Sequence, residues 1–153
     1  MGTFNPGGLN APPKSIVNQF SSGGVIGAGI ADANGAKQVL SGALTAATYK
    51  ELLAISGSGV LEMAYAKAMD ATSRTVGLKI IIDGTTVFDA VSGTTTTADT
   101  CVLAVGNRGY FAAGINSYLT RGAVPFNSSL SIQAKSSLSE TDKVAVGYAY
   151  RLT

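Results

Sequence analysis

The sequence predicts an all-β protein: an antiparallel β-sandwich or jelly-roll-like domain of roughly eight strands, preceded by an extended N-terminal arm. Three observations lead to this fold. Residues 144–152 alternate between large apolar and small or polar side chains without a break, the period of a strand. Asp83-Gly84 lies between two β-branched runs, a strong hairpin signal. Several such short runs separated by turn residues are typical of a sandwich.

The first 24 residues differ from the rest of the chain. They contain three of the four prolines, two glycine pairs and a single charged residue, Lys14. Proline and glycine at this density disfavour helices and central strands. We therefore divide the chain into an extended arm, residues 1–24, and a β-sandwich domain, residues 25–153. The apolar residues spaced along the arm are predicted to anchor it to a partner surface; they are Phe4, Leu9, Ile16 and Phe20. The alternative is a loose terminus with incidental apolar residues.

From Lys37 onward the pattern is that of β-structure. Residues 49–54 and 60–69 are rich in helix formers, yet we interpret the second segment as a strand because its side chains alternate. Its larger residues are expected on one side with alanines opposite: Leu61, Met63, Tyr65 and Met69.

The remaining strands follow from the same criterion. Residues 76–82 and 85–91 form the predicted hairpin, and residues 99–105 a further strand. Residues 130–135 and 144–152 are the last two strands, joined by a loop over residues 136–142.

Composition limits the function. Only 13% of the 153 residues are charged while 46% are hydrophobic, and histidine is absent. A free soluble domain carries about 25% charged residues, and histidine is the usual acid or base near neutral pH. These values suit a protein of an assembly better than an enzyme. The single cysteine, Cys101, lies in an apolar run and is predicted to be a buried thiol.

Other classes are also disfavoured. A net charge of +2 is too weak for a nucleic-acid partner, no apolar run has the roughly 20 residues of a membrane helix, and we expect no export signal. The glycines of residues 23–29 are in the wrong order for a dinucleotide loop. Residues 32–35 lack the later ligands of a calcium loop. We therefore expect no cofactor and no metal.

Glycoside hydrolysis needs a pair of carboxylates, and five carboxylates are available for it: Glu51, Glu62, Asp83, Asp89 and Asp99. None has a recognisable context, so no catalytic residue is assigned. The segment from Asn107 to Val124 mixes glycines with bulky side chains and is predicted to be a contact loop, through Tyr110, Phe111, Tyr118 and Arg121. Tyr148 and Tyr150 are expected in the core or in packing between subunits, and the alternative is a sugar-binding or protein-binding face.

Four segments together resemble a group of small virion proteins of tailed bacteriophages and prophages. They are residues 70–75 (DATSRT), 79–89 (KIIIDGTTVFD), 125–130 (PFNSSL) and 141–150 (TDKVAVGYAY). The resemblance covers roughly residues 44–153 and leaves out the N-terminal arm.

The resemblance implies a structural role in a virion assembled in the bacterial cytoplasm. Proteins of this group serve as capsid decoration (cement) proteins, head fibres or tail-fibre modules. The expected partners are the major capsid protein and further copies of this chain, with trimers suited to local three-fold positions. The alternatives are a fibre module that binds a host-surface glycan and, from another class, a glycan-cleaving enzyme.

Overall fold

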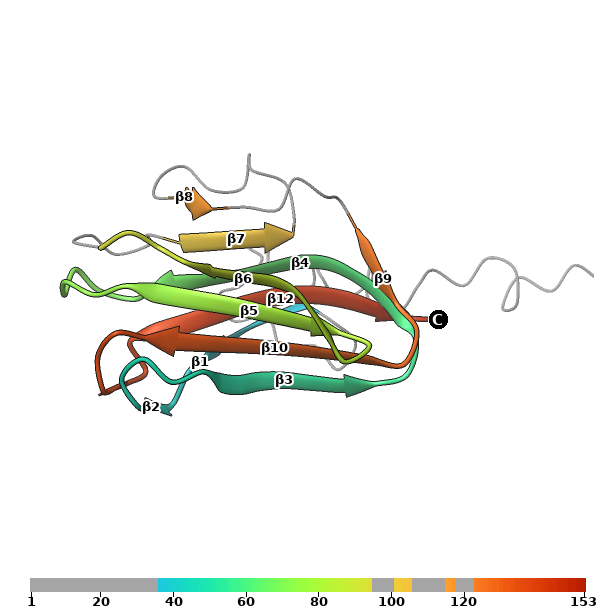
Figure 1. The fold of residues 1–153 in the computed structure, drawn as a ribbon, viewed down its shortest axis with the longest axis horizontal. Coiled ribbons are helices and arrows are strands. Elements are labelled where there is room, and N and C mark those ends of the chain that lie inside the picture. Colours follow the sequence, from blue (N-terminus) through green and yellow to red (C-terminus); the bar gives the residue numbers. More distant parts are fainter. Residues whose placement is uncertain (1–35, 95–100, 106–114, 118–122) are drawn as a thin grey trace, which may run out of the picture.

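The computed structural model describes residues 36–94, 101–105, 115–117 and 123–153. Every regular element in these residues is a β-strand, and the strands form two sheets that face each other as a sandwich (Figure 1). The predicted all-β fold is therefore confirmed. The N-terminal arm lies outside the described residues. None of the described residues forms a helix long and apolar enough to span a bilayer.

The two large sheets differ in width. The six-stranded sheet has the order β1 (Ala36–Leu40), β12 (Val144–Leu152), β4 (Gly59–Ala68), β7 (Cys101–Val105) and β8 (Ile115–Ser117), with β9 (Val124–Phe126) also paired to β4. The four-stranded sheet has the order β3 (Lys50–Ser56), β10 (Ser129–Ser136), β5 (Val76–Ile82) and β6 (Thr85–Val91). A small third sheet pairs β2 (Ala43–Leu44) with β11 (Glu140–Thr141).

The pairing is antiparallel, as predicted, except between β7 and β8, which run parallel. Two loop predictions need correction. The predicted contact loop contains β8 and, at its end, β9; the predicted loop over residues 136–142 contains β11. These strands have only two or three residues, too few for alternation to be visible in the sequence.

The hairpin predicted at Asp83-Gly84 is confirmed. The two strands are β5 and β6, with Ile82 opposite Thr85. Asp83 and Gly84 have φ values of 51° and 79°, the left-handed conformation that a two-residue hairpin turn requires at both central positions.

Both segments rich in helix formers are strands, β3 and β4. The predicted faces of β4 need correction, because the pairing shifts by one residue between Met63, opposite Ala149, and Leu61, opposite Tyr150. A residue inserted in this way reverses the alternation. Leu61 consequently belongs to the core, whereas Met63 and Tyr65 are not part of that cluster.

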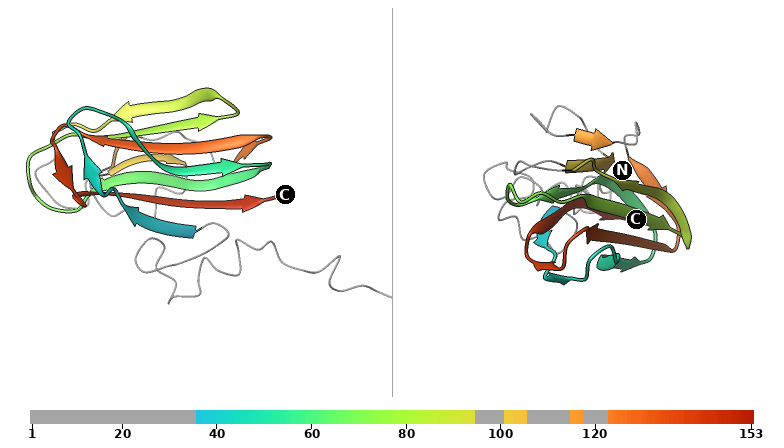
Figure 2. Two further views of the ribbon diagram at one scale, coloured as in Figure 1. Left: turned by 90° about the horizontal axis from the view of Figure 1, so that it is seen from below. Right: turned by 60° about the vertical axis from the view of Figure 1, so that its left-hand side comes forward.

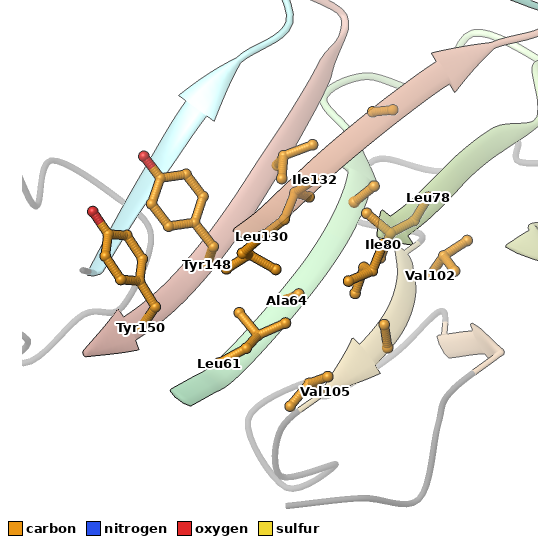
Figure 3. Packing of buried hydrophobic residues seen from close by; sticks show 14 of the residues in the cluster. Leu61, Ala64, Leu78, Ile80, Val102, Val105, Leu130, Ile132, Tyr148 and Tyr150 are labelled. Atoms are coloured by element: carbon orange, nitrogen blue, oxygen red, sulfur yellow. The ribbon is translucent and has the colours of Figure 1, made fainter. Parts of the chain in front are cut away.

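The core fills the space between the two large sheets (Figure 3). Val144 and Val146 of β12 are fully buried there, in the same cluster as Leu130 and Ile132 of β10. Tyr148 and Tyr150 belong to the same cluster, with ring centroids 6.1 Å apart. Both tyrosines therefore lie in the core, one of the positions expected for them.

Candidate functional site

A cluster around Tyr49 lies on the outer face of the four-stranded sheet. Tyr49 precedes β3, and its hydroxyl donates a hydrogen bond to Asp89 of β6, at the opposite edge of that sheet. The ring therefore reaches across β10 and β5. The Lys79 ammonium lies 4.2 Å from the ring centroid and that of Lys135 4.4 Å. Gly77 makes room for this arrangement, because a Cβ there would stand 3.1 Å from the Tyr49 hydroxyl and 2.7 Å from Lys135 Cγ.

The charges of this cluster are coupled. Burial, followed by the hydrogen bond to Asp89, raises the pKa of Tyr49 far above its usual range, so the phenol remains a donor. That same hydrogen bond, helped by the charge of Lys79, lowers the pKa of Asp89. The Lys79 ammonium lies 3.4 Å from Asp89 Oδ2.

Two ammonium groups and one carboxylate leave this cluster with a net charge of +1 when Tyr49 is neutral. Both lysines gain cation–π attraction from the same ring. The arrangement could accept an anionic group on its surface, and it also connects β5, β6 and β10 to Tyr49, the residue before β3.

A second group of charges lies around Arg74, in the connection before β5. Arg74 is only 2% exposed, and its Nη2 donates to Asp70 Oδ1 at 2.5 Å. Arg74 Nε lies 3.0 Å from Glu140 Oε2 of β11, without the alignment of a hydrogen bond. Lys143 Nζ lies 3.2 Å from Asp70 Oδ2. The hydrogen bonds from Arg74 and from the backbone of Thr72 hold the pKa of Asp70 well below its usual range.

The side chain of the turn residue Asp83 also binds the backbone of another segment. Its Oδ1 accepts hydrogen bonds from the backbone N–H groups of Asn127, Ser128 and Ser129, at 2.7–3.1 Å. These bonds lower the pKa of Asp83 far below its ordinary value. The carboxylate thereby joins the β5–β6 hairpin to the β9–β10 connection.

The carboxylates considered for glycoside hydrolysis are engaged separately. Glu51 accepts a hydrogen bond from Ser131, and Glu62 forms an ion pair with Arg151 at 3.0 Å. Asp83 and Asp89 have the partners given above, and Asp99 lies outside the described residues. Each of these four described carboxylates therefore has its own hydrogen-bond or ion-pair partner in the fold.

The predicted binding residues fall in parts of the chain outside the described ranges. The arm anchors Phe4, Leu9, Ile16 and Phe20 and the contact-loop residues Tyr110, Phe111, Tyr118 and Arg121 lie outside the described residues, as does the Cys101 side chain. Sequence reasoning missed Tyr49 and Arg74. Tyr49 begins residues 49–54, a segment in which the helix formers were the visible pattern and gave no sign of a contact with Asp89. The ion pair of Arg74 with Asp70 could have been suspected from the sequence, because the two residues lie four positions apart.

Among the described residues, no group of three or more histidine, cysteine, aspartate or glutamate side chains is placed to hold a metal ion. No protein-family model matches the chain. The searches of curated proteins and of solved structures likewise return no match.

Proposed function

We propose that this chain is a structural protein of a bacteriophage virion, one that decorates and stabilises the capsid as a homo-oligomer. The main support is how the protein uses its few charges. Asp83, Arg74 and Asp89 bind other parts of the same chain, and only 13% of the residues are charged. A sandwich with so few charged side chains suits permanent contact with other subunits. The resemblance of residues 44–153 to virion proteins supports the same role.

The expected partner is the major capsid protein, contacted through the N-terminal arm, together with further copies of this chain. A trimer would match a local three-fold position of an icosahedral shell. Many weak attachments repeated over the shell would then act together, which gives avidity without a large interface on each copy.

The test is the location and copy number of the chain in purified virions. Quantitative mass spectrometry should find it in a fixed, high ratio to the major capsid protein, and an antibody should label the head. Virions that lack the chain should lose genome at a lower temperature than complete virions, and adding the purified protein should restore their resistance. A few copies at the tail tip, or unchanged heat resistance, would contradict capsid decoration.

A fibre module that binds a host-surface glycan is the second candidate, and the Tyr49 cluster favours it. Aromatic rings and ammonium groups together suit an acidic polysaccharide. In that case the purified protein should bind host polysaccharide, and K79A/K135A should abolish binding. K50A/K143A, which also removes two charges at exposed positions outside the cluster, is the matched control. Release of new reducing ends would instead indicate the third alternative, a glycan-cleaving enzyme.

A further inference from the structure

The outer face of the four-stranded sheet carries a row of polar side chains that crosses all four strands. Glu51 of β3 lies opposite Gln133 of β10. Gln133 in turn lies opposite Lys79 of β5, and Lys79 lies opposite Asp89 of β6. The neighbours of these residues along β5 and β10 belong to the core, so the row faces away from the core. Figure 2 shows the four strands as one layer of the sandwich.

The charges on this outer face have a definite order. The two edge strands carry the exposed carboxylates of Glu51 and Asp89. The two central strands carry Lys79 and Lys135, whose ammonium groups lie 4.2 and 4.4 Å from the centroid of the Tyr49 ring. The face is therefore positive over its central strands and negative at both edges.

Lys135 is held in place by packing. Its aliphatic stem lies across Gly77 of β5, where an added Cβ would stand 2.7 Å from Lys135 Cγ and 2.8 Å from Lys135 Cε. Its ammonium group lies over the Tyr49 ring. Lys79 has Asp89 3.4 Å away, whereas Lys135 forms no ion pair with a described carboxylate. A lysine side chain loses much rotamer freedom when it is fixed, so an anion that binds Lys135 avoids part of that cost.

The order of the charges determines which anionic ligand fits. A single carboxylate fits over the central ammonium groups. A polymer with a charge on every unit would also bring negative groups close to Glu51 and Asp89, and like charges repel. Neutral hydroxyl-bearing units can instead donate hydrogen bonds to these two carboxylates, which have several acceptor sites each. The face therefore suits a chain in which carboxylates are separated by neutral units.

Two other occupants are less complementary to this face. A second copy of the protein, stacked centre to centre on the same face, would place lysines opposite lysines. A nucleic-acid strand carries a phosphate on every unit, so its charges would meet the carboxylates at both edges. Charge complementarity therefore favours a polysaccharide in which acidic and neutral sugars alternate.

We propose that the outer face of the four-stranded sheet binds an acidic polysaccharide whose carboxylates are separated by neutral sugars. Lys135 makes the main contact with the carboxylate and Lys79 supports it, while Glu51 and Asp89 disfavour densely charged polymers. This assignment deepens the glycan-binding candidate given above and rests on it. It does not depend on where in the virion the chain lies.

The test measures binding of the full chain to three polysaccharides that differ in charge spacing. They are hyaluronate, which has a carboxylate on every second sugar, polygalacturonate, which has one on every sugar, and uncharged dextran. Hyaluronate should bind about fivefold more tightly than polygalacturonate, the effect expected of two exposed charge repulsions. Dextran should bind more weakly than hyaluronate, and added salt should weaken hyaluronate binding.

Single substitutions assign the effect to this face. K135A should lower the affinity for hyaluronate at least about tenfold, as the loss of hydrogen bonds to a charged group does. K143A removes a charge at an exposed position outside the face and should leave this affinity unchanged. E51Q should raise the affinity for polygalacturonate severalfold and leave that for hyaluronate nearly unchanged, a change of preference that loss of folding cannot produce. K135Q repeats the first test if K135A does not fold.

The possible failures are distinguishable. Hyaluronate binding that is unchanged in K135A would reject this site while leaving the glycan-binding candidate in place. Equal affinity for hyaluronate and polygalacturonate, or an unchanged ratio in E51Q, would overturn the selectivity assigned to the edge carboxylates. If neither these polysaccharides nor host polysaccharide bind, the glycan-binding candidate and this inference fail together.

Discussion

At the scale of single residues, several charged side chains form hydrogen bonds and ion pairs between segments that are distant in the sequence. Asp83 is the clearest case, because one carboxylate occupies a left-handed turn position and accepts three backbone N–H groups from the β9–β10 connection. Tyr49 and Arg74 connect strands and loops in a similar way. The contacts of Asp70, Asp83 and Asp89 lower the pKa of these carboxyl groups, so the contacts depend on pH.

Stability should fall in acid partly through Asp83. Its pKa is lowered by the folded state, while an unfolded aspartate titrates near 3.9. Its contribution is therefore complete above about pH 4 and decreases as the pH falls toward the folded pKa. D83N keeps a side chain that tolerates the turn but removes the charge. Melting temperatures from pH 7 to 2 should decline less steeply for D83N than for the unmodified chain. Equal slopes would show that the carboxylate charge contributes nothing.

Gly147 should be needed because of Tyr65 and not because of its own backbone. A Cβ at position 147 would collide with the Tyr65 ring. G147A should therefore cost about 1–3 kcal/mol of unfolding free energy, as overpacking does. In a Y65A background the same change should cost little, since the collision is gone. Urea denaturation of the four proteins of this double-mutant cycle gives the coupling. An equal cost in both backgrounds would contradict the contact.

At the scale of elements, β12 lies centrally in the fold. It pairs with β1 on one side and β4 on the other, and seven consecutive residues, 144–150, are buried. Both of its faces are covered, which is unusual for an antiparallel strand. Its core-facing side chains belong to the same cluster as those of β10.

V146D should disrupt the whole domain. Val146 is fully buried in the core, so the substitution would place an unpaired carboxylate there, at a cost of several kcal/mol out of the roughly 5–15 kcal/mol that stabilises a domain. L152D adds the same charge at a 51% exposed position of the same strand and should change the melting temperature little. A soluble V146D protein with an unchanged melting temperature would refute the central position of β12.

At the scale of the whole molecule, residues 36–153 contain the two sheets and the core between them. Residues 1–24 lie outside the described ranges. The predicted division into an arm and a domain therefore leads to a test by truncation.

Deleting residues 1–24 should leave a folded β-domain that no longer binds capsids. Four spaced apolar anchors would each contribute roughly 1.5–3 kcal/mol on burial, offset by about 1–2 kcal/mol for each backbone residue that becomes ordered. Attachment should therefore need several anchors together. Circular dichroism and melting report folding, and cosedimentation with capsids reports binding. Decoration by the shortened chain at the level of the full chain would assign attachment to the sandwich.

The elements that could be predicted from the sequence are those governed by local rules. Alternation places side chains on two faces of a strand wherever the chain is extended, so β5, β6, β10 and β12 were predictable. Asp83-Gly84 is the preferred dipeptide for its turn. Each of these signals is contained within about ten residues, and no knowledge of distant partners is needed.

The remaining features were decided by tertiary structure. The inserted residue in β4 appears only in its pairing with β12, and the parallel contact of β8 with β7 depends on where the connecting segments run. Tyr49 reaches Asp89 across two intervening strands, and Arg74 meets Glu140 sixty-six positions later in the chain. A single sequence without aligned relatives holds no record of such distant contacts. Periodicity reveals which side chains share a face, whereas only the packed sheets determine what each face meets.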